Sequence, residues 1–201
     1  MTTTRIKAAS LVYGALALSA GGWGLLRGNP DIYHHPQAWL RLPLLPGVLG
    51  GLVVGGALGL AVGTATRASV RRFGWARQLH VEFRQIFGPL RTREILAFAL
   101  LSSVAEELFF RGALQPSTGL VASSLVFGLL HVGPTRRFVP WTAMAVVMGF
   151  LFGLLFIATG ELAAPIAAHF TINYVNLQYI SDYDPVPAAG RWPAEKLPLR
   201  A

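Results

Sequence analysis

Four polar side chains lie in otherwise apolar stretches and have the chemistry to act on a carbonyl group. They are Glu106, His131, His169 and Asn173. A carboxylate such as Glu106 can take a proton from water, and an imidazole such as His131 can orient that water or share its proton. His169 and Asn173 can donate hydrogen bonds to the oxyanion of a tetrahedral intermediate. Together these residue types predict a hydrolytic site.

Polar and aromatic side chains in these stretches also recur at a spacing of four residues. The pairs are Glu107 with Arg111, Phe127 with His131, and His169 with Asn173. Residues four apart share a face of a helix. We interpret Glu107 and Arg111 as a mainly structural ion pair, because the acid precedes the base in the favourable order. For each histidine alone the simpler interpretation is a hydrogen bond to a backbone carbonyl of a neighbouring helix.

Glu106, His131 and His169 fall at similar depths along their apolar stretches. At about 1.5 Å of rise per residue, Glu106 and His169 both lie roughly 18 Å from the same edge of a bilayer core, and His131 roughly 12 Å. The three side chains are therefore within about one helical turn of one another in depth. This favours convergence on one site, although depth does not say which helix faces meet.

Other catalytic chemistries find less support in the sequence. The chain has no cysteine, which excludes a thiol nucleophile, a disulfide and a thiolate metal ligand. There is no HExxH pattern and no aspartate inside an apolar stretch, so zincin-like and aspartyl mechanisms lose support. Glu106, His131 and His169 could still hold zinc with a fourth position open for water. We favour a mechanism without a cofactor and keep zinc as the alternative.

The elements that must position these residues are apolar helices in a bilayer. Of the 201 residues, 53% are hydrophobic and 13% are charged, whereas a soluble domain has about a quarter of its residues charged. A bilayer core takes about 20 apolar residues as helix, and the apolar runs lack the alternation of strands. The sequence predicts an all-α polytopic membrane bundle with six spans, at about 8–26, 47–66, 95–114, 119–133, 141–159 and 162–180.

The second predicted span carries a glycine at every fourth position. These glycines are Gly47, Gly51, Gly55, Gly59 and Gly63. A ridge without side chains lets another helix approach closely. The approaching helix belongs either to the same chain or to a second copy, so a homo-oligomer formed through this ridge is one expectation.

The segment between the second and third spans, residues 67–93, holds seven arginines against one acid, Glu82. Its apolar residues follow helical spacing, which predicts a basic amphipathic helix lying on the membrane surface and contacting membrane lipids. We expect Gly88 and Pro89 to end or bend this helix. Because the segment is held between two spans and has no recognised motif, we expect no nucleic-acid binding.

The basic residues also predict the orientation of the chain. Fourteen of the seventeen lysines and arginines fall on the side that carries the N-terminus, whereas Arg27 and Arg41 fall on the other side. This bias predicts that both termini lie in the cytoplasm, and with the compact length it indicates a bacterial inner membrane. We expect one membrane domain over 1–181 and a proline-rich tail over 182–201. The first span also fits a cleavable signal peptide.

Three short motifs resemble those of a known family. The segment from Glu106 to Arg111 matches EExxxR, that from Phe127 to His131 matches FxxxH, and that from His169 to Asn173 matches HxxxN. They occur in the family's order on three predicted helices. On these residues the chain resembles the CPBP family of intramembrane proteases, which includes CAAX prenyl endopeptidases and bacteriocin-processing enzymes. The resemblance covers a core of about 95–176.

The resemblance implies hydrolysis of a peptide bond near the membrane, in a membrane-associated protein or peptide. It implies that Glu106 and His131 activate water, and that His169 and Asn173 stabilise the oxyanion. Glu107, Arg111 and Phe127 are then supporting residues. Two alternatives stay open: a nonenzymatic membrane regulatory or immunity protein of the same fold, and a small transporter or proton channel that uses the buried carboxylates as a relay.

Overall fold

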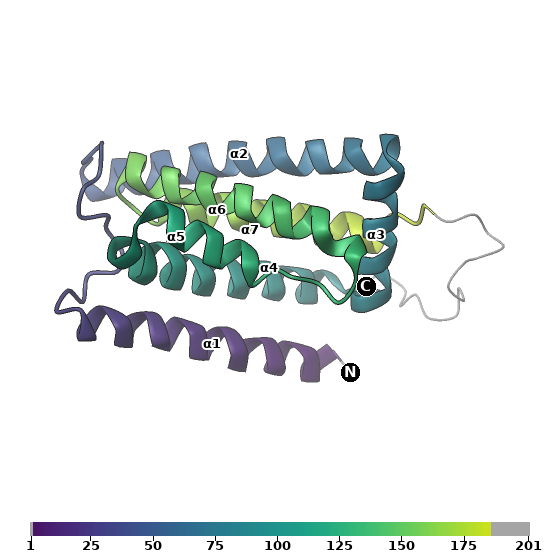
Figure 1. The fold of residues 1–201 in the computed structure, drawn as a ribbon, viewed down its shortest axis with the longest axis horizontal. Helices are drawn as coiled ribbons and strands as arrows, with labels where there is room; N and C mark the ends of the chain where they lie inside the picture. The colour runs from purple at the N-terminus through teal and green to yellow at the C-terminus, as the bar shows by residue number, and fades with distance from the viewer. Residues whose placement is uncertain (1, 186–201) are drawn as a thin grey trace.

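The chain folds into an all-helical bundle in the computed structural model, which describes residues 2–185 (Figure 1). The helices are α1 (Thr2–Leu26), α2 (Leu44–Arg72), α3 (Gly74–Phe87), α4 (Thr92–Glu107), α5 (Gln115–Leu129), α6 (Val139–Thr159) and α7 (Ala163–Asp182). A π-helical segment, η1 (Leu108–Leu114), joins α4 to α5, and a short 3-10 turn, η2 (Arg136–Phe138), precedes α6. The predicted all-α class is confirmed. Most of the tail expected over 182–201 lies outside the described residues.

Each predicted span forms a helix, but the helices differ in how well they suit a bilayer. Within the described residues, α1, α2 and the continuous η2–α6 segment are long and apolar enough to cross a membrane by length and composition. The α4–η1 segment and α7 are less apolar because they carry candidate site residues: Glu106, Glu107, Arg111, His169 and Asn173. With 15 residues, α5 is about 22 Å long, which is shorter than a core of about 30 Å.

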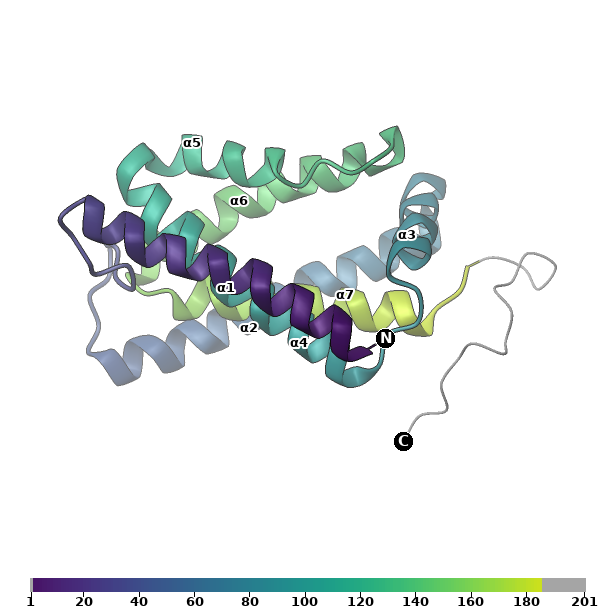
Figure 2. The same cartoon turned by 90° about the horizontal axis from the view of Figure 1, so that it is seen from below.

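Helix α7 lies inside the bundle, where it contacts α2, α4 and α6. The other close pairs are α5 with α6 and α1 with α4 and η1. The long helices run along one common direction, and α3 lies across one end of them (Figure 1). Seen from below, α1 passes over α4, and α5 lies beside α6 (Figure 2). The residues with candidate chemistry therefore come from neighbouring helices.

The glycine ridge of α2 is occupied by α7 of the same chain. All of its glycines are buried. A Cβ added at Gly55 would lie 2.1 Å from the carbonyl oxygen of Ala164, and one added at Gly59 would lie 2.5 Å from Cβ of Thr171. Only a residue without a side chain permits such a close approach. The partner of the ridge is internal, so the ridge is not the open face that the expected homo-oligomer requires.

Helix α3 is the amphipathic helix predicted between the second and third spans. It is shorter than the basic segment over 67–93, because α2 continues to Arg72 before α3 begins at Gly74. Gly88 follows its last residue with a φ of 61°, a left-handed conformation that glycine adopts at little cost. The predicted end of the helix at this glycine is confirmed.

Two side chains of α3 fasten it to the C-terminal end of α7. The ring Nε2 of His80 is 2.9 Å from the carbonyl oxygen of Tyr183, and Nη1 of Arg84 donates to the same oxygen at 3.0 Å. Arg84 also forms an ion pair with Asp184 at 3.5 Å. Burial lowers the pKa of His80 below its ordinary value of 6.5. The crossing helix is therefore held by polar contacts to the backbone as well as by apolar packing.

The third predicted span is not a regular α-helix throughout. Beyond Glu107 it continues as the π-helical segment η1. At the start of the fourth predicted span, within α5, the backbone breaks at Gly119, where φ is 85° and ψ is 167°. π-Helical turns are rare and occur frequently at functional sites. Here the wider turn comes directly after the two adjacent glutamates and contains Arg111.

Candidate active site

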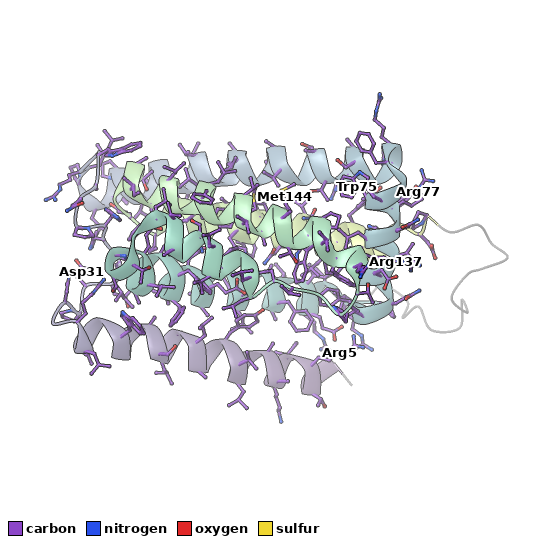
Figure 3. The ribbon with its side chains drawn as sticks, viewed as in Figure 1. Arg5, Asp31, Trp75, Arg77, Arg137 and Met144 are labelled. Atoms are coloured by element: carbon purple, nitrogen blue, oxygen red, sulfur yellow. The ribbon has the colours of Figure 1, made fainter. Side chains whose placement is uncertain are left out.

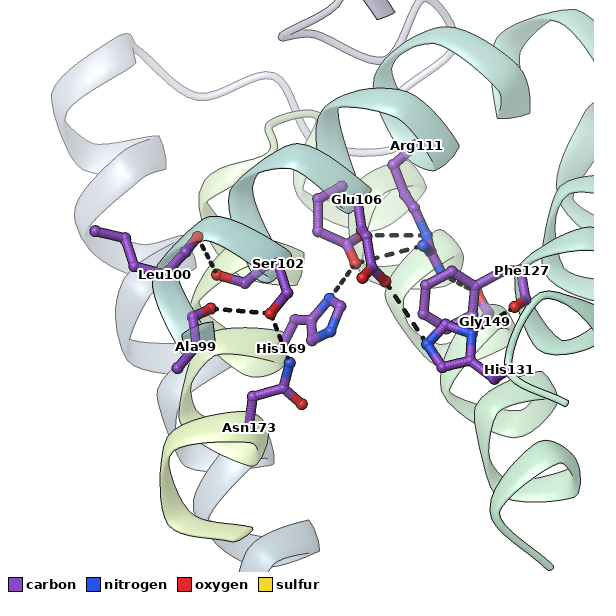
Figure 4. Close-up of polar contacts among 12 residues, drawn as sticks. Ala99, Leu100, Ser102, Glu106, Arg111, Phe127, His131, Gly149, His169 and Asn173 are labelled. Carbon is purple, nitrogen blue, oxygen red and sulfur yellow. Dashed lines mark hydrogen bonds and ion pairs between the residues drawn. The ribbon is translucent and has the colours of Figure 1, made fainter. Parts of the chain in front are cut away.

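Glu107 lies at the centre of a buried polar cluster, and its partners Arg111 and His169 are labelled in Figure 4. Its Oε2 is 3.2 Å from Nε of Arg111, and its Oε1 is 2.8 Å from Nδ1 of His169 on α7. Arg111 also donates from Nη2 to the carbonyl oxygen of Gly149 on α6 at 3.1 Å. The side chains of Arg111 and Glu107 are 1% and 0% exposed, so each charge is compensated by protein groups alone. The predicted pair is present, and Glu107 has a second partner that spacing did not reveal.

Aromatic rings surround the guanidinium of Arg111. Its central carbon is 4.3 Å from the ring centre of Phe127 and 5.4 Å from that of Phe152, and a planar guanidinium is favoured over an aromatic face. The ring centre of Phe127 is also 4.5 Å from that of His131 and 6.0 Å from that of His169. Phe127 is therefore in contact with the buried cation and with both imidazoles.

Glu106 and His131 form a second, less enclosed group. Oε2 of Glu106 and Nε2 of His131 are 3.7 Å apart, and the two side chains are 12% and 19% exposed. The separation exceeds a normal hydrogen bond. Among the described residues, Oε2 of Glu106 is buried without a hydrogen-bond partner. The two atoms face each other at a distance that lets both contact one small polar molecule.

The backbone at His131 differs from the prediction. The sequence places this residue inside the fourth span, whereas α5 ends at Leu129 and His131 lies in the turn that follows. Its Nδ1 is 2.7 Å from the carbonyl oxygen of Phe127, one of the last carbonyls of α5, which has no partner within the helix. A carbonyl oxygen only accepts, so Nδ1 carries the hydrogen and Nε2 has a lone pair in the neutral ring.

Asn173 contacts α4 rather than the ionisable residues. Its Nδ2 donates to Oγ of Ser102 at 2.9 Å, and Ser102 donates to the carbonyl oxygen of Phe98 at 2.7 Å. Ser102 is four residues before Glu106 and lies on the same face of α4. The asparagine amide has two hydrogens, of which one is used by this contact. One donor of Asn173 therefore stays available next to the Glu106 face.

His169 is held by one hydrogen bond and one ring contact. Its ring stacks on Phe152 with centroids 5.1 Å apart and planes inclined by 21°. Because the carboxylate of Glu107 accepts, Nδ1 of His169 carries a hydrogen. Nε2 can then donate a hydrogen bond only when the ring is an imidazolium. The donor role predicted for this histidine therefore depends on its charged form.

Three of the four predicted residues thus occupy two adjoining groups, and Asn173 contacts Ser102 instead. Glu106 faces His131, while His169 contacts Glu107, and these groups are joined by the adjacency of the two glutamates and by Phe127. Sequence reasoning missed Ser102 and Phe152. Ser102 could have been found from its four-residue spacing to Glu106, whereas an apolar ring in an apolar span, such as Phe152, gives no signal.

The zinc alternative requires three ligands on one centre. In the part of the chain that the structure describes, no three histidine, aspartate or glutamate side chains are arranged to hold a metal ion. Nδ1 of His169 is bonded to Glu107, and Nδ1 of His131 is bonded to a backbone carbonyl. As placed, the proposed ligands Glu106, His131 and His169 do not fit a metal, and no step below is derived through one.

Comparisons with known proteins agree on the segment that contains this site. Residues 89–175 match a family described as type II CAAX prenyl endopeptidase Rce1-like. The chain is also similar to the uncharacterized protein YpbD of Bacillus subtilis (strain 168), with 37% identity over 92 residues, which cover 46% of this chain and 48% of that relative. The chain thus spans about half the length of this curated relative. No solved structure matches the chain.

The matched segment extends from just before α4 into α7, and it contains every residue of the two groups described above. Helices α1, α2 and α3 precede it in the chain. Both the three motifs and the family comparison therefore concern the helices that carry the polar clusters. Residues 89–175 of the chain are thus similar to the Rce1-like family.

Proposed function

We propose that this protein is an intramembrane endopeptidase that hydrolyses a peptide bond near the membrane in a membrane-associated protein or peptide. The observation that carries the proposal is the approach of Glu106 Oε2 and His131 Nε2 to 3.7 Å. Both atoms are acceptors when the imidazole is neutral, so a water molecule between them can donate one hydrogen to each. This arrangement suits water activation, and the Rce1-like match supports the same reaction class.

In the proposed reaction, Glu106 takes one proton from the water that His131 orients. The resulting hydroxide forms a C–O bond to the carbonyl carbon of the peptide, and the C=O electron pair moves onto the oxygen. When this oxyanion collapses, the C–N bond breaks and Glu106 returns its proton to the leaving nitrogen. The products are a carboxylic acid and an amine, and Glu106 is again a carboxylate.

His169 and Asn173 are the proposed donors to the oxyanion. Asn173 retains one Nδ2 hydrogen beside the one that it donates to Ser102. His169 donates from Nε2 as an imidazolium, whose positive charge the buried carboxylate of Glu107 compensates. Arg111 in turn compensates Glu107. In this proposal Glu107 and Arg111 position His169 and do not react.

The site lies among apolar helices, which supports a membrane-embedded peptide or protein tail as the substrate class. We propose the bacterial inner membrane as the location, with both termini in the cytoplasm. Two described basic residues of the predicted cytoplasmic side support this orientation because both contact α3 at one end of the bundle. Arg5 donates to the carbonyl oxygen of Phe87 at the end of α3, and Arg137 pairs with Glu82 of α3.

Replacing the proposed base tests this function directly. We expect Glu106→Gln to lower kcat by about 10²–10⁴-fold, the range for a lost general base. The assay uses the purified protein in liposomes with a set of internally quenched peptides, each joined to one apolar helix, and follows the release of fluorescence. The control is Glu82→Gln, which removes a carboxylate of α3 that pairs with Arg137. A Glu106→Gln rate equal to that of the control would contradict the proposal.

The same liposomes separate the remaining alternatives. Wild-type protein that binds the peptides without cleaving any of them would favour the nonenzymatic regulatory or immunity role. A proton flux that Glu106→Gln abolishes, without peptide cleavage by the wild type, would favour the channel. Elemental analysis of the purified protein addresses the cofactor: stoichiometric zinc whose removal abolishes cleavage would overturn the metal-free mechanism.

A further inference from the structure

A cavity of about 360 Å³ lies at the end of the bundle opposite α3. Its walls come from the segment between α1 and α2 and from the turn between α6 and α7, and neither carries a residue of the proposed hydrolysis. Asp31, which lines the cavity, is labelled at this end in Figure 3, whereas Trp75 and Arg77 mark the end that carries α3. The cavity is therefore separate from the candidate active site, and its size is within the range of ligand sites.

Backbone contacts fasten the two walls of this cavity to each other. The amide of His35 donates to the carbonyl oxygen of Gly160 at 3.0 Å. Beside this bond, His34 and Glu161 form an isolated antiparallel β-bridge. The segment before α2 is therefore paired with the turn before α7 along its backbone, and the side chains of both walls are held around the same space.

Glu161 places a carboxylate without a partner in this cavity. The residue is 8% exposed, yet among residues 2–185 its carboxylate has no hydrogen bond and no ion pair. Asp31, by contrast, is 3.0 Å from Nδ1 of His34. A Cβ added to Gly47 would collide with Oε1 of Glu161, so the carboxylate lies at the beginning of α2, where the helix dipole favours a negative charge. An ionised carboxylate that is nine-tenths buried is stabilised by a bound cation.

Hydrogen-bond donors line the same cavity. Nη2 of Arg41 donates to the carbonyl oxygen of Pro36 at 2.8 Å, which uses one of the five hydrogens of the guanidinium. Burial lowers the pKa of His35 below its ordinary value of 6.5, so this ring is neutral at pH 7. Its Nδ1 accepts from the amide of Gln37 at 3.1 Å, so Nε2 carries the hydrogen and is a donor. One cavity thus combines an anion for a ligand's cation with donors for a ligand's anion.

The lining residues also distinguish between kinds of cation. Quaternary ammonium groups are bound by cages of aromatic rings, and no Phe, Tyr or Trp of the described chain lines this cavity. A metal ion needs several ligands on one centre, and no three His, Asp or Glu of the described chain are arranged to hold one. A primary ammonium group, however, can donate charge-assisted hydrogen bonds to a single carboxylate. The cavity therefore favours a primary ammonium compound that also carries an anionic group.

We propose that this cavity binds a phosphoethanolamine group, with its ammonium on Glu161 and its phosphate on Arg41 and His35. The inference is independent of the proposed hydrolysis. This chemistry is shared by free phosphoethanolamine and by the headgroup of phosphatidylethanolamine. The cavity lies where α1 ends, α2 begins and α6 ends, and each of these helices is long and apolar enough to cross a membrane. Lipid headgroups lie at the ends of such spans, so the lipid is the expected source of the group.

The test measures lipid binding to the full chain by native mass spectrometry from detergent. Phosphatidylethanolamine and phosphatidylcholine with the same acyl chains are titrated separately, because they differ only in the methylation of the ammonium. We expect the wild type to bind phosphatidylethanolamine at least about tenfold more tightly, since only its ammonium donates hydrogen bonds to Glu161. We expect Glu161→Gln to lose this preference, because the charged acceptor is removed.

The matched control is Glu82→Gln, which removes a carboxylate at the other end of the bundle, where it pairs with Arg137. This variant should keep the wild-type preference. Arg41→Gln is the second variant, and it should weaken the binding of both lipids by about tenfold, because both carry the phosphate. If thermal unfolding in detergent shows that Glu161→Gln does not fold, Arg41→Gln decides, and wild-type affinity for both lipids in Arg41→Gln would contradict the site.

Free phosphoethanolamine distinguishes the two sources of the group. Displacement of the lipid by the free compound, together with a higher unfolding temperature of the wild type but not of Glu161→Gln, would support the chemistry and assign a soluble ligand. Tight binding of the lipid without such displacement would support the headgroup as the ligand. Equal affinity of the wild type for the two lipids, or the same preference in Glu161→Gln as in Glu82→Gln, would overturn the proposal.

Discussion

Glu106 and Glu107 are adjacent in the chain but have different surroundings. Successive residues of a helix point about 100° apart, so one carboxylate faces Arg111 and His169 while the other faces His131. Glu107 has charged or polar partners on both oxygens and is fully buried. Glu106 is partly exposed, and its Oε2 is 3.7 Å from Nε2 of His131. Charge compensation and the proposed chemistry are thus assigned to two neighbouring side chains.

The buried pair makes a prediction about stability. We expect Arg111→Met to lower the free energy of unfolding by about 3–5 kcal/mol, because it leaves the carboxylate of Glu107 buried without its cation. Adding Glu107→Gln should recover part of this loss, since no unpaired charge is then left. Thermal unfolding in detergent measures both variants. Arg137→Met is the control: its side chain is 62% exposed in the pair with Glu82, and ion pairs at the surface contribute about 0–1 kcal/mol. Equal losses in Arg111→Met and Arg137→Met would contradict this account.

Among the elements, α2 and α7 show how the bundle places the site. Glycines along α2 let α7 approach to backbone contact, and α7 in turn carries His169 and Asn173 against α4. The π-helical turn of η1 follows the glutamates directly. The two glutamates therefore extend from an α-helix, whereas Arg111 extends from a π-helix. The position of the polar groups therefore depends on two local departures from an ordinary α-helical bundle.

The close contact of α2 and α7 predicts opposite effects at adjacent glycines. A Cβ at Gly55 would lie 2.1 Å from the backbone oxygen of Ala164, whereas one at Gly56 meets nothing within 4 Å. We expect Gly55→Ala to destabilise the protein by about 1–3 kcal/mol through overpacking. We expect Gly56→Ala to stabilise it by up to about 1 kcal/mol, because alanine is the better helix former. Thermal unfolding of the two variants, measured side by side, checks the ridge, and equal shifts would show that α7 does not pack there.

For the whole molecule, α3 closes one end of the bundle. Figure 3 shows Trp75, Arg77 and Arg137 at this end, and Asp31 at the opposite end. The side chains of Arg84 and His80 tie α3 to the last residues of α7, while Arg137 beyond α5 pairs with Glu82 of α3. Three segments far apart in sequence are therefore joined on the side that we propose to be cytoplasmic.

We expect the contact between α3 and the end of α7 to weaken at acidic pH. Burial lowers the pKa of His80 below 6.5 in the docked state, in which α3 packs against the end of α7. In the undocked state His80 is exposed and has its ordinary pKa of 6.5. At a pH between these two pKa values, the undocked state therefore binds more protons than the docked state. Stability of the docked state is therefore full above about pH 6.5 and falls as pH drops toward the lower, docked pKa. Hydrogen exchange of the α3 amides between about pH 7.5 and pH 5.5, corrected for intrinsic rates, measures the change.

The control for this prediction is His80→Phe, which keeps an aromatic ring beside Tyr179 and Tyr183 but has no titrating group. Its α3 protection should not change between the two pH values. The ion pair of Arg84 with Asp184 is kept in both proteins. If wild type and variant lose protection to the same extent, His80 is not the group responsible.

The sequence by itself determined the helices, the amphipathic segment and the polar residues. Long apolar runs predict spans because every backbone polar group in a bilayer must be hydrogen-bonded within the protein. The helical spacing of apolar residues in an arginine-rich segment predicted α3. Spacing also predicted the pair of Glu107 with Arg111, because residues four apart meet within one helix. These features depend on the spacing of residues within one helix, which can be derived from the sequence directly.

The tertiary structure alone decided which helix faces meet. It showed that α7 fills the glycine ridge and that His169 contacts Glu107. It also placed His131 in a turn beyond α5, where its ring caps a free carbonyl. Each of these contacts joins groups through packing or through the end of a helix, and such contacts follow from the fit of whole surfaces, which residue spacing does not encode.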